Sequence, residues 1–253
     1  MAAVKRLFPR EHGAYAVLVA SWCCGVALAR DITIGSIAAL FAGLALFIAQ
    51  EPMKAMLRAS RTKGAGTSAQ TAIRQFALLV TLGVLLLSVL AIGSPRILAT
   101  LPLAALIGYV NFFLYRRRAP LVLQSIAGFG LLSLLAPLVY LQHPEASVWK
   151  GAQIWIELAL FFTAAALTVG VRLKASSRAY CLRYYAISLP LVAIAFALGC
   201  YSFAGMLALS LSAGRFIWIS TNLSAYLNFS LKRIGIHETI VTVALVVIYF
   251  LIP

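Results

Sequence analysis

The chain has 253 residues, of which 63% are hydrophobic and only 11% are charged. A soluble domain of this size needs far more polar surface, so the composition excludes a soluble globular protein and predicts an integral membrane protein. The formal net charge of +15, from 21 Lys and Arg against 6 Asp and Glu, would suggest a nucleic-acid partner in a soluble protein. In a membrane protein such an excess reflects topology instead, and we expect no nucleic acid to bind.

A bilayer core of about 30 Å needs roughly 17 to 25 apolar residues per helix, and nine apolar segments are long enough to cross it. The predicted spans are 13–29, 32–50, 75–93, 96–115, 120–141, 151–171, 184–200, 203–229 and 236–252. The sequence therefore predicts an all-α fold, a single-domain polytopic transmembrane bundle of about nine helices.

The start of the eighth span is open between two turns. "GCYSFAG" places the turn at 200–205, which puts Arg215 near the middle of the membrane. "SAGR" places the turn at 212–215, which puts Arg215 at the outer surface. The two alternatives therefore give Arg215 different surroundings.

The basic residues are distributed unevenly between the loops that join these spans. Arg30, Arg96 and Lys150 fall on one side, Arg215 falls inside a span, and the other Lys and Arg residues fall on the opposite side. Short cytoplasmic loops collect positive charge. The pattern predicts a multi-pass protein with its N-terminus in the cytoplasm and its C-terminus outside.

The cysteines and histidines form no metal-binding pattern. Cys23 and Cys24 are adjacent, Cys181 and Cys200 are isolated, and no Cys-x-x-Cys pair occurs. The three histidines are spread along the chain. We therefore predict no metal site and no resident cofactor. A bound lipid or quinone-like isoprenoid is the small molecule that we expect.

Two pairs of short segments suggest an internal repeat. "LRASR" (57–61) is similar to "LKASSR" (173–178), which begins 116 residues later. "NFFLYRR" (111–117) is similar to "NFSLKR" (228–233), which begins 117 residues later. These matches predict a parallel tandem repeat of four helices. The predicted parts are the halves 12–118 and 119–233 and a final helix 236–252. The alternative is chance similarity between basic helix ends.

The predicted architecture resembles the UbiA superfamily of intramembrane prenyltransferases. "YRRRAPLVLQSIAGFGLLSLLAPLVY" (115–140) is similar to that superfamily's stretch between helices four and five. "PREHGAYAVL" (9–18) and "KRIGIHETI" (232–240) resemble the two ends of the YwiC-like family of bacterial multi-pass membrane proteins. The YwiC-like resemblance implies a bacterial cytoplasmic (inner) membrane and names no activity.

The chain lacks the Asp-rich motifs that the UbiA enzymes use for catalysis. They hold a prenyl diphosphate through magnesium ions, which need several carboxylate ligands from Asp-rich motifs. The segment "AQEPMKAMLRASR" (49–61) offers Glu51 alone, and "VRLKASSRAYCLR" (171–183) offers no carboxylate. We therefore predict no magnesium-dependent prenyl transfer, and whether the protein is an enzyme stays open.

Basic and polar side chains gather where the predicted cytoplasmic loops meet the helix ends. The candidate ligand-binding residues are Lys54, Arg58, Arg61, Lys63, Asn111, Arg116, Arg172, Lys174, Arg178, Arg183, Asn222 and Tyr226. The cations could hold a phosphate or carboxylate through charge-assisted hydrogen bonds. The alternative is that they only set the topology and contact anionic lipid head groups.

The few carboxylates mark a second set of candidates. Glu11, Glu51 and Glu238 fall at predicted cytoplasmic helix ends, and His12 and His237 are next to two of them. These five residues are the candidate catalytic or ligand-orienting groups, because Glu and His are easily tuned for acid and base work. For Glu238 the alternative is a purely electrostatic role at a helix N-terminus.

A polar stripe runs along the predicted span 203–229. It consists of Arg215, Trp218, Asn222 and Tyr226. An Arg at the bilayer centre costs about 2.5–3.5 kcal/mol on insertion scales, so the stripe should face the interior of the bundle. We expect Arg215 to form an intramembrane pair with Glu157 of the span 151–171.

Three functions fit these features. The first is binding or modification of an isoprenoid- or lipid-like amphiphile in a cavity with a basic cytoplasmic mouth, with membrane lipids as partners. The second is a non-catalytic subunit of a larger respiratory, photosynthetic or biosynthetic membrane complex. The third is a small-molecule or proton-coupled transporter that uses Glu157, Arg215 or Glu238 as its coupling site.

Overall fold

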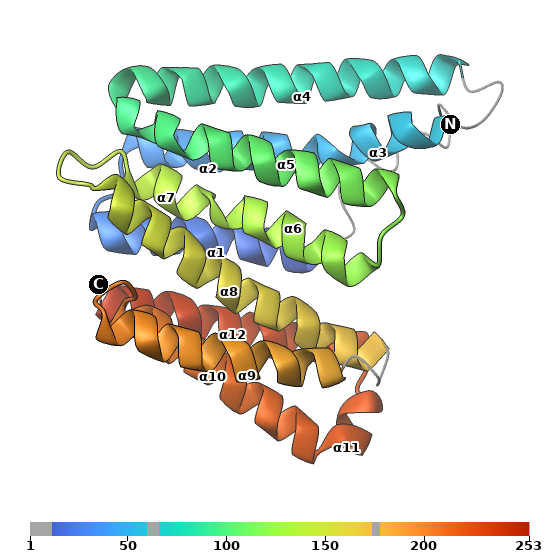
Figure 1. The fold of residues 1–253 in the computed structure, drawn as a ribbon. Coiled ribbons are helices and arrows are strands. Elements are labelled where there is room, and N and C mark those ends of the chain that lie inside the picture. The colour runs from blue at the N-terminus through green and yellow to red at the C-terminus, as the bar shows by residue number, and fades with distance from the viewer. Residues whose placement is uncertain (1–11, 60–65, 174–177, 253) are drawn as a thin grey trace.

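The computed structural model describes residues 12–59, 66–173 and 178–252, and the regular elements in these ranges are all helices. The elements are α1 (His12–Ala29), α2 (Ile34–Ile48), α3 (Gln50–Ala59), α4 (Gly66–Gly93), the 3-10 segment η2 (Pro95–Thr100), α5 (Leu101–Arg116), α6 (Leu121–Ser133), α7 (Leu135–Tyr140), α8 (Val148–Leu173), α9 (Arg178–Ala197), α10 (Phe203–Thr221), α11 (Leu223–Leu227) and α12 (Leu231–Leu251). The prediction of an all-α polytopic bundle is confirmed (Figure 1).

Within the described ranges, eight helical runs are long and apolar enough to cross a membrane. They are Ile34–Leu57, Gln70–Gly93, Pro95–Arg116, Val122–Tyr140, Val148–Val171, Arg178–Ala197, Phe203–Thr221 and Lys232–Leu251. The shorter apolar helix Gly13–Ala29 precedes them. Together these runs follow the nine predicted segments in order.

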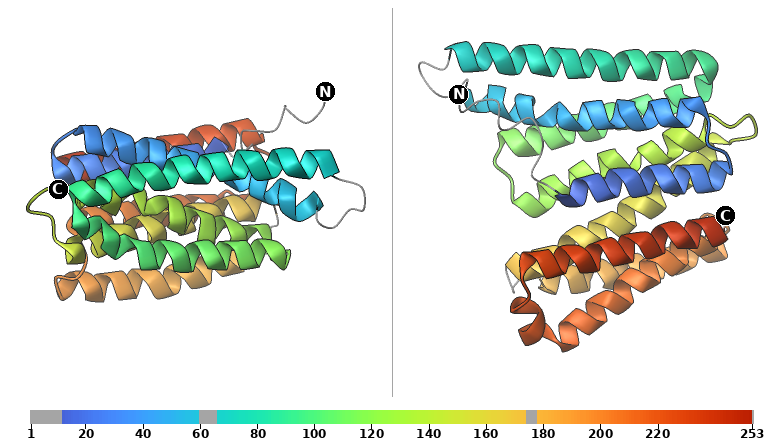
Figure 2. Two further views of the ribbon diagram at one scale, coloured as in Figure 1. Left: turned by 90° about the horizontal axis from the view of Figure 1, so that it is seen from above. Right: turned by 180° about the vertical axis from the view of Figure 1, so that it is seen from behind.

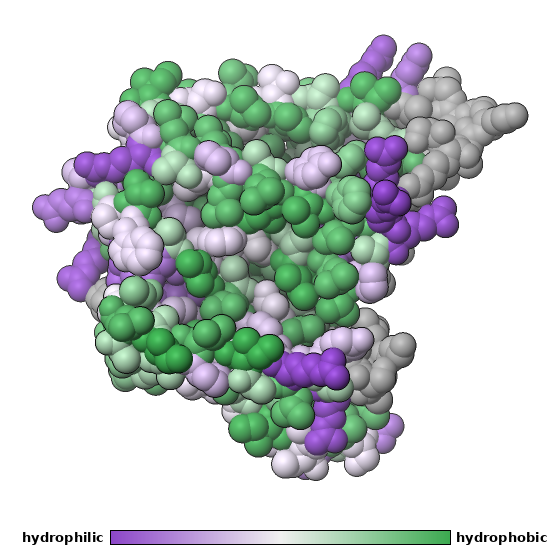
Figure 3. All heavy atoms as spheres, viewed as in Figure 1, coloured by the Kyte–Doolittle hydropathy of each residue, from purple (hydrophilic) through white to green (hydrophobic). Residues whose placement is uncertain are grey.

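The surface of the helices is apolar, as expected for a protein surrounded by lipid. Leu85, Val89 and Ile92 on α4 are all more than half exposed. Figure 3 shows hydrophobic residues over much of one face and hydrophilic residues toward both ends of the helices. Such an apolar surface would be unfavourable in water but is suited to contact with lipid acyl chains. The helical backbone is also suited to the bilayer, because its N–H and C=O groups bond to each other within the helix.

The helices lie side by side and run between two ends of the bundle (Figures 1 and 2). One end, which we call the basic end, holds α11 and the start of α12, with Arg116–Arg118 and Lys232–Arg233. The other end, the C-terminal end, holds the end of α12 and the turn between α9 and α10. The predicted topology makes the basic end cytoplasmic.

α1 lies at the centre and packs against α7 and α12. Leu18 of α1, Phe161 and Phe162 of α8 and Tyr249 of α12 belong to one buried cluster. Gly25 permits the close contact with α7, because a Cβ at this position would lie 2.6 Å from the Ala136 carbonyl oxygen. This buried cluster therefore joins α1, α7, α8 and α12.

The break between α6 and α7 has a local cause. Pro137 has no N–H to donate to the carbonyl four residues earlier, at Ser133, which is where α6 ends. α7 continues in the same span as far as Tyr140.

The turn before α10 resolves the two alternatives for the eighth span. α9 ends at Ala197, Gly199 has a positive φ of 71°, and Ser202 is the N-cap of α10. Residues 212–215 lie inside α10, so the turn at 212–215 is wrong and the first alternative is correct. Arg215 is therefore a helical residue inside the bundle. The tandem repeat and its boundaries stay predictions.

Candidate functional site

A cleft of about 910 Å³ lies between α1, α6, α8 and α12. Small residues on two facing helices leave this space unfilled, among them Gly13 and Ala16 on α1 and Ala165 and Ala166 on α8. A Cβ added at Gly13 would meet nothing within 4 Å. The sequence therefore produces the cleft by placing short side chains where a close-packed core would have large ones.

The walls of this cleft are mostly apolar, with a few polar groups from α6 and α12. The polar lining residues are Ser125, Lys232, Glu238, Thr239 and Thr242. Ile236 and Ile240 of α12 line the cleft and are more than half exposed, so it is open along this helix. A cleft of this kind can accept an apolar chain and retain one polar group at Glu238.

A smaller cavity of about 180 Å³ adjoins the cleft at α10, α11 and α12. It is lined by Arg215, Trp218, Ile219, Tyr226, Phe229, Ile234, His237 and Glu238. Ile234 and Glu238 line both spaces, so the two spaces are adjacent at these side chains. We call this smaller space the arginine pocket.

Arg215 pairs with Glu238 across the arginine pocket. Nη1 of Arg215 donates to Oε2 of Glu238 at 2.7 Å, and the two side chains are 10% and 23% exposed. Nε and Nη2 of Arg215 are buried and have no hydrogen-bond partner among the described residues. Half of this guanidinium therefore remains available for bonding.

Aromatic rings surround this ion pair. The His237 ring stacks on Phe229 with centroids 5.8 Å apart and lies 6.2 Å from Trp218. The Arg233 guanidinium lies 4.2 Å above the centroid of the Phe229 ring. This arrangement places a cation–π contact at the start of α12 and makes the pocket walls flat and apolar.

The predicted pair of Arg215 with Glu157 is wrong. Glu157 binds Ser202, which precedes Arg215 by thirteen residues along α10, so the two side chains lie roughly 20 Å apart along the helix axis at 1.5 Å per residue. Glu238 of α12 lies at the depth of Arg215 and takes this role instead.

Glu157 is instead held by four neutral donors near the C-terminal end. Its Oε1 accepts from Gln153 Nε2 at 3.0 Å and from the Ser202 backbone N–H at 2.7 Å. Its Oε2 accepts from Ser202 Oγ at 2.9 Å and from the Tyr249 hydroxyl at 2.6 Å. Glu157 is 3% exposed. Because every partner donates, the geometry fits an ionised carboxylate, and the N-terminus of α10 supports the negative charge.

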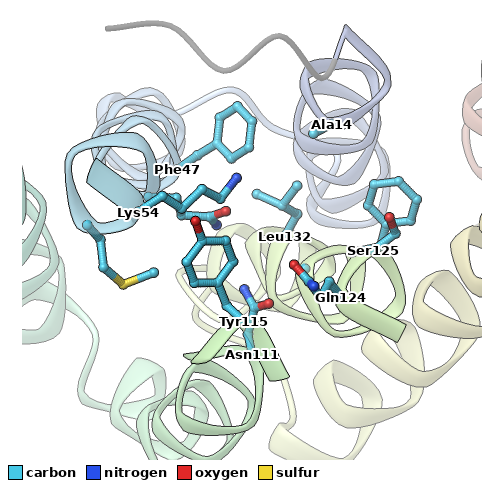
Figure 4. A pocket seen from close by; sticks show the side chains of 12 residues that line it. Ala14, Phe47, Lys54, Asn111, Tyr115, Gln124, Ser125 and Leu132 are labelled. Carbon is cyan, nitrogen blue, oxygen red and sulfur yellow. The ribbon is translucent and has the colours of Figure 1, made fainter. Parts of the chain in front are cut away.

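A third, polar pocket of about 50 Å³ lies toward the basic end between α1, α3, α5 and α6. Figure 4 shows Lys54, Asn111, Tyr115, Gln124 and Ser125 around it. Lys54 Nζ donates to Glu51 Oε1 at 3.0 Å, and Gln124 Nε2 donates to the Ala119 carbonyl at 2.7 Å.

The polar pocket is adjacent to the large cleft, because Ser125 and Phe129 of α6 line both. The three spaces therefore follow one another across the bundle, with polar groups at the two outer ones and an apolar cleft in the middle. An amphiphile in the cleft could reach polar side chains on either side.

The structure brings the predicted site residues into two groups rather than one. Glu51, Lys54 and Asn111 lie at the polar pocket. Arg215, Tyr226, His237 and Glu238 line the arginine pocket. Glu51 and Glu238 therefore belong to separate sites.

Four other candidates with described positions line none of these three spaces, and one of them is Arg183, an exposed residue of α9. Asn222 caps the end of α10 by donating from Nδ2 to the Trp218 carbonyl at 3.0 Å. Arg116 ends α5, and Arg178 begins α9. Glu11, Arg61, Lys63 and Lys174 lie outside the described residues, as do the side chains of His12, Arg58 and Arg172.

Sequence reasoning missed several polar side chains that the fold brings together. Ser202 and Tyr249 bind Glu157, and Gln124 and Ser125 line the polar pocket. Gln153 had a usable signal, because it precedes Glu157 by one helical turn and therefore shares its face. The others come from distant segments, and no local spacing connects them.

Comparison with known proteins places the chain in a family. The family model described as YwiC-like protein matches residues 8–140, which is more than half of the chain. The chain belongs to the YwiC-like family. No curated protein and no solved structure matches it.

The YwiC-like match covers the region from α1 to α7, including Glu51, Lys54 and Asn111 of the polar pocket. It stops before α10 and α12, so the resemblance of 232–240 to the end of the family stays a prediction. The UbiA-like architecture also stays a prediction.

Proposed function

We propose that this YwiC-like membrane protein binds an isoprenoid- or lipid-like amphiphile in the cleft between α1, α6, α8 and α12. The observation that carries the proposal is the shape and chemistry of the cleft. Its volume of about 910 Å³ lies within the range of about 300–1,000 Å³ that is typical of ligand pockets. Its walls are mostly apolar, and Lys232 and Glu238 give it two ionisable groups.

The opening along α12 supports entry from the bilayer. Ile236 and Ile240 are exposed on the same helix that carries Glu238. An amphiphile whose chain is already in the membrane could enter the cleft laterally from the bilayer without passing through water. Binding would then replace lipid contacts by protein contacts, with the polar group of the ligand fixing its orientation.

The direct test is native mass spectrometry and solvent extraction of the full-length protein purified in a neutral detergent. We expect a stoichiometric amphiphile in the wild type. Ala165→Phe should reduce its occupancy, because Ala165 lines the cleft and the larger ring fills the space. Ala105→Phe makes the same change on the exposed surface of α5 and should retain the ligand.

Two results would contradict the proposal that the cleft binds an amphiphile. It fails when no amphiphile co-purifies and none binds on addition, or when Ala165→Phe and Ala105→Phe retain the ligand equally. Thermal unfolding of both variants serves as the control for folding.

A further inference from the structure

The arginine pocket holds a buried cation whose hydrogen bonds are only partly used. The Arg215 side chain is nine-tenths buried and lines the pocket, yet only Nη1 has a partner. Leaving N–H groups of a charged side chain buried and unpaired is costly. Pinning α10 to α12 requires no more than the single contact with Glu238, so helix packing alone does not explain the unused groups.

The two unused nitrogens form one edge of the guanidinium. The Nε–H and one N–H of Nη2 point in the same direction, which is the fork that matches two oxygens of a carboxylate or phosphate. Glu238 holds Nη1 on the other side and so fixes the plane of the group. Arg215 is therefore oriented in advance for a bidentate acceptor.

The surrounding charges favour an anion over a cation. Lys232 lines the adjoining cleft, and Arg233 lies on the Phe229 ring at the wall of the pocket. Glu238 is the only carboxylate among the described residues that line the two spaces. Lys232, Arg233 and Arg215 thus outweigh one carboxylate. A ligand oxyanion would balance the local charge, which a cationic head group would not.

The dimensions divide the ligand between the two spaces. The arginine pocket, at about 180 Å³, has room for a head group, whereas the cleft of about 910 Å³ has room for a long chain. Because Ile234 and Glu238 line both, a head group beside Arg215 can be continuous with a chain in the cleft. We infer that Arg215 binds the carboxylate or phosphate head group of an amphiphile whose chain lies in the cleft. This inference rests on the proposed function.

The test compares three probes on the full-length protein in phosphatidylcholine nanodiscs. Radiolabelled farnesyl monophosphate carries both chain and oxyanion, farnesol carries the chain alone, and inorganic phosphate carries the oxyanion alone. Binding to empty nanodiscs is subtracted. We expect farnesyl monophosphate to bind at least about tenfold more tightly than farnesol, because charge-assisted hydrogen bonds are added.

The double variant Arg215→Gln with Glu238→Gln removes both charges and leaves no unpaired ion. It should weaken farnesyl monophosphate binding by about tenfold or more and change farnesol binding by less than about twofold. Arg215→Lys keeps the charge and loses the fork, so it should also weaken the phosphate probe. This second variant serves when the double variant does not fold. Arg30→Gln removes an exposed cation that follows α1 and lines neither space, so it should have no effect.

The inference is overturned when wild type binds farnesol as tightly as farnesyl monophosphate, or when the double variant or Arg215→Lys leaves their ratio unchanged. Inorganic phosphate competing at the concentration of farnesyl monophosphate would show an oxyanion site that gains nothing from the chain, which also overturns it. Failure of the proposed function gives a different result. In that case Ala165→Phe leaves the binding of farnesol and of farnesyl monophosphate unchanged, whether or not the Arg215 variants alter it.

Discussion

Tyr249→Phe should destabilise the protein by removing one donor from the buried Glu157 carboxylate. The Tyr249 hydroxyl donates to Oε2 of Glu157 at 2.6 Å, and Tyr249 is 1% exposed. Phenylalanine keeps the ring and its packing, so the change isolates the hydrogen bond. Hydrogen bonds to charged groups contribute about 1.5–3 kcal/mol. We expect a loss of about 2 kcal/mol, which is roughly a 30-fold change in the unfolding equilibrium.

Tyr201→Phe is the matched control beside the same carboxylate. Tyr201 is 6% exposed, and its hydroxyl has no hydrogen-bond partner among the described residues. Burial, with Glu157 nearby, raises the pKa of Tyr201, so its phenol stays neutral at physiological pH. Removing this hydroxyl should be neutral or stabilising, because it takes away an unpaired buried polar group.

The measurement is reversible unfolding by sodium dodecyl sulfate in mixed micelles, followed by tryptophan fluorescence. A thermodynamic cycle with Glu157→Gln adds a second criterion, since Tyr249→Phe should cost less once the acceptor is uncharged. The reasoning is refuted when Tyr249→Phe loses no more stability than Tyr201→Phe, or when its cost is the same in both backgrounds.

Three further changes test other parts of the structure. Gly205→Ala should lower stability in the same assay by about 1–3 kcal/mol, because its Cβ would lie 2.6 Å from the locked Glu157 side chain, whereas Gly214→Ala meets nothing within 4 Å and should be neutral or slightly stabilising. Arg215→Gln alone should unfold more readily than the charge-free double variant, because the single change leaves the partly buried Glu238 carboxylate unpaired. Equal stabilities would contradict this. In a variant that keeps only the exposed Cys200, an impermeant maleimide added to intact cells should label the protein. Labelling only after lysis would contradict the predicted orientation.

The fold class was predictable because it depends on composition and on the lengths of apolar runs. A bilayer core fixes how long an apolar helix must be, so the spans can be found without knowledge of their neighbours. The turn at Gly199 and Ser202 was also visible as one of two alternatives. The choice between them was not, because "SAGR" is equally compatible with a turn in the sequence and lies inside α10 in the structure.

For the candidate site, individual residues were predictable from the sequence but their partners were not. Arg215 and Glu238 were both recognisable, because an isolated charge in an apolar span is rare and must be satisfied. Their pairing was not recognisable, because a partner on another helix depends on the depth and rotation of both helices. The assignment of Glu157 to Arg215 failed for this reason. Glu157 of α8 binds Ser202, which precedes Arg215 by thirteen residues.

The sequence by itself determined that the chain is a helical membrane protein, where its spans lie and which polar side chains in them require a partner. Those properties follow from hydropathy and from the cost of burying charge, and both are local. Only the tertiary structure decided that Glu238 meets Arg215, that Tyr249 and Ser202 meet Glu157, and that small residues of α1 and α8 border one cleft. These contacts join segments far apart in the chain, so they depend on how the helices pack against each other.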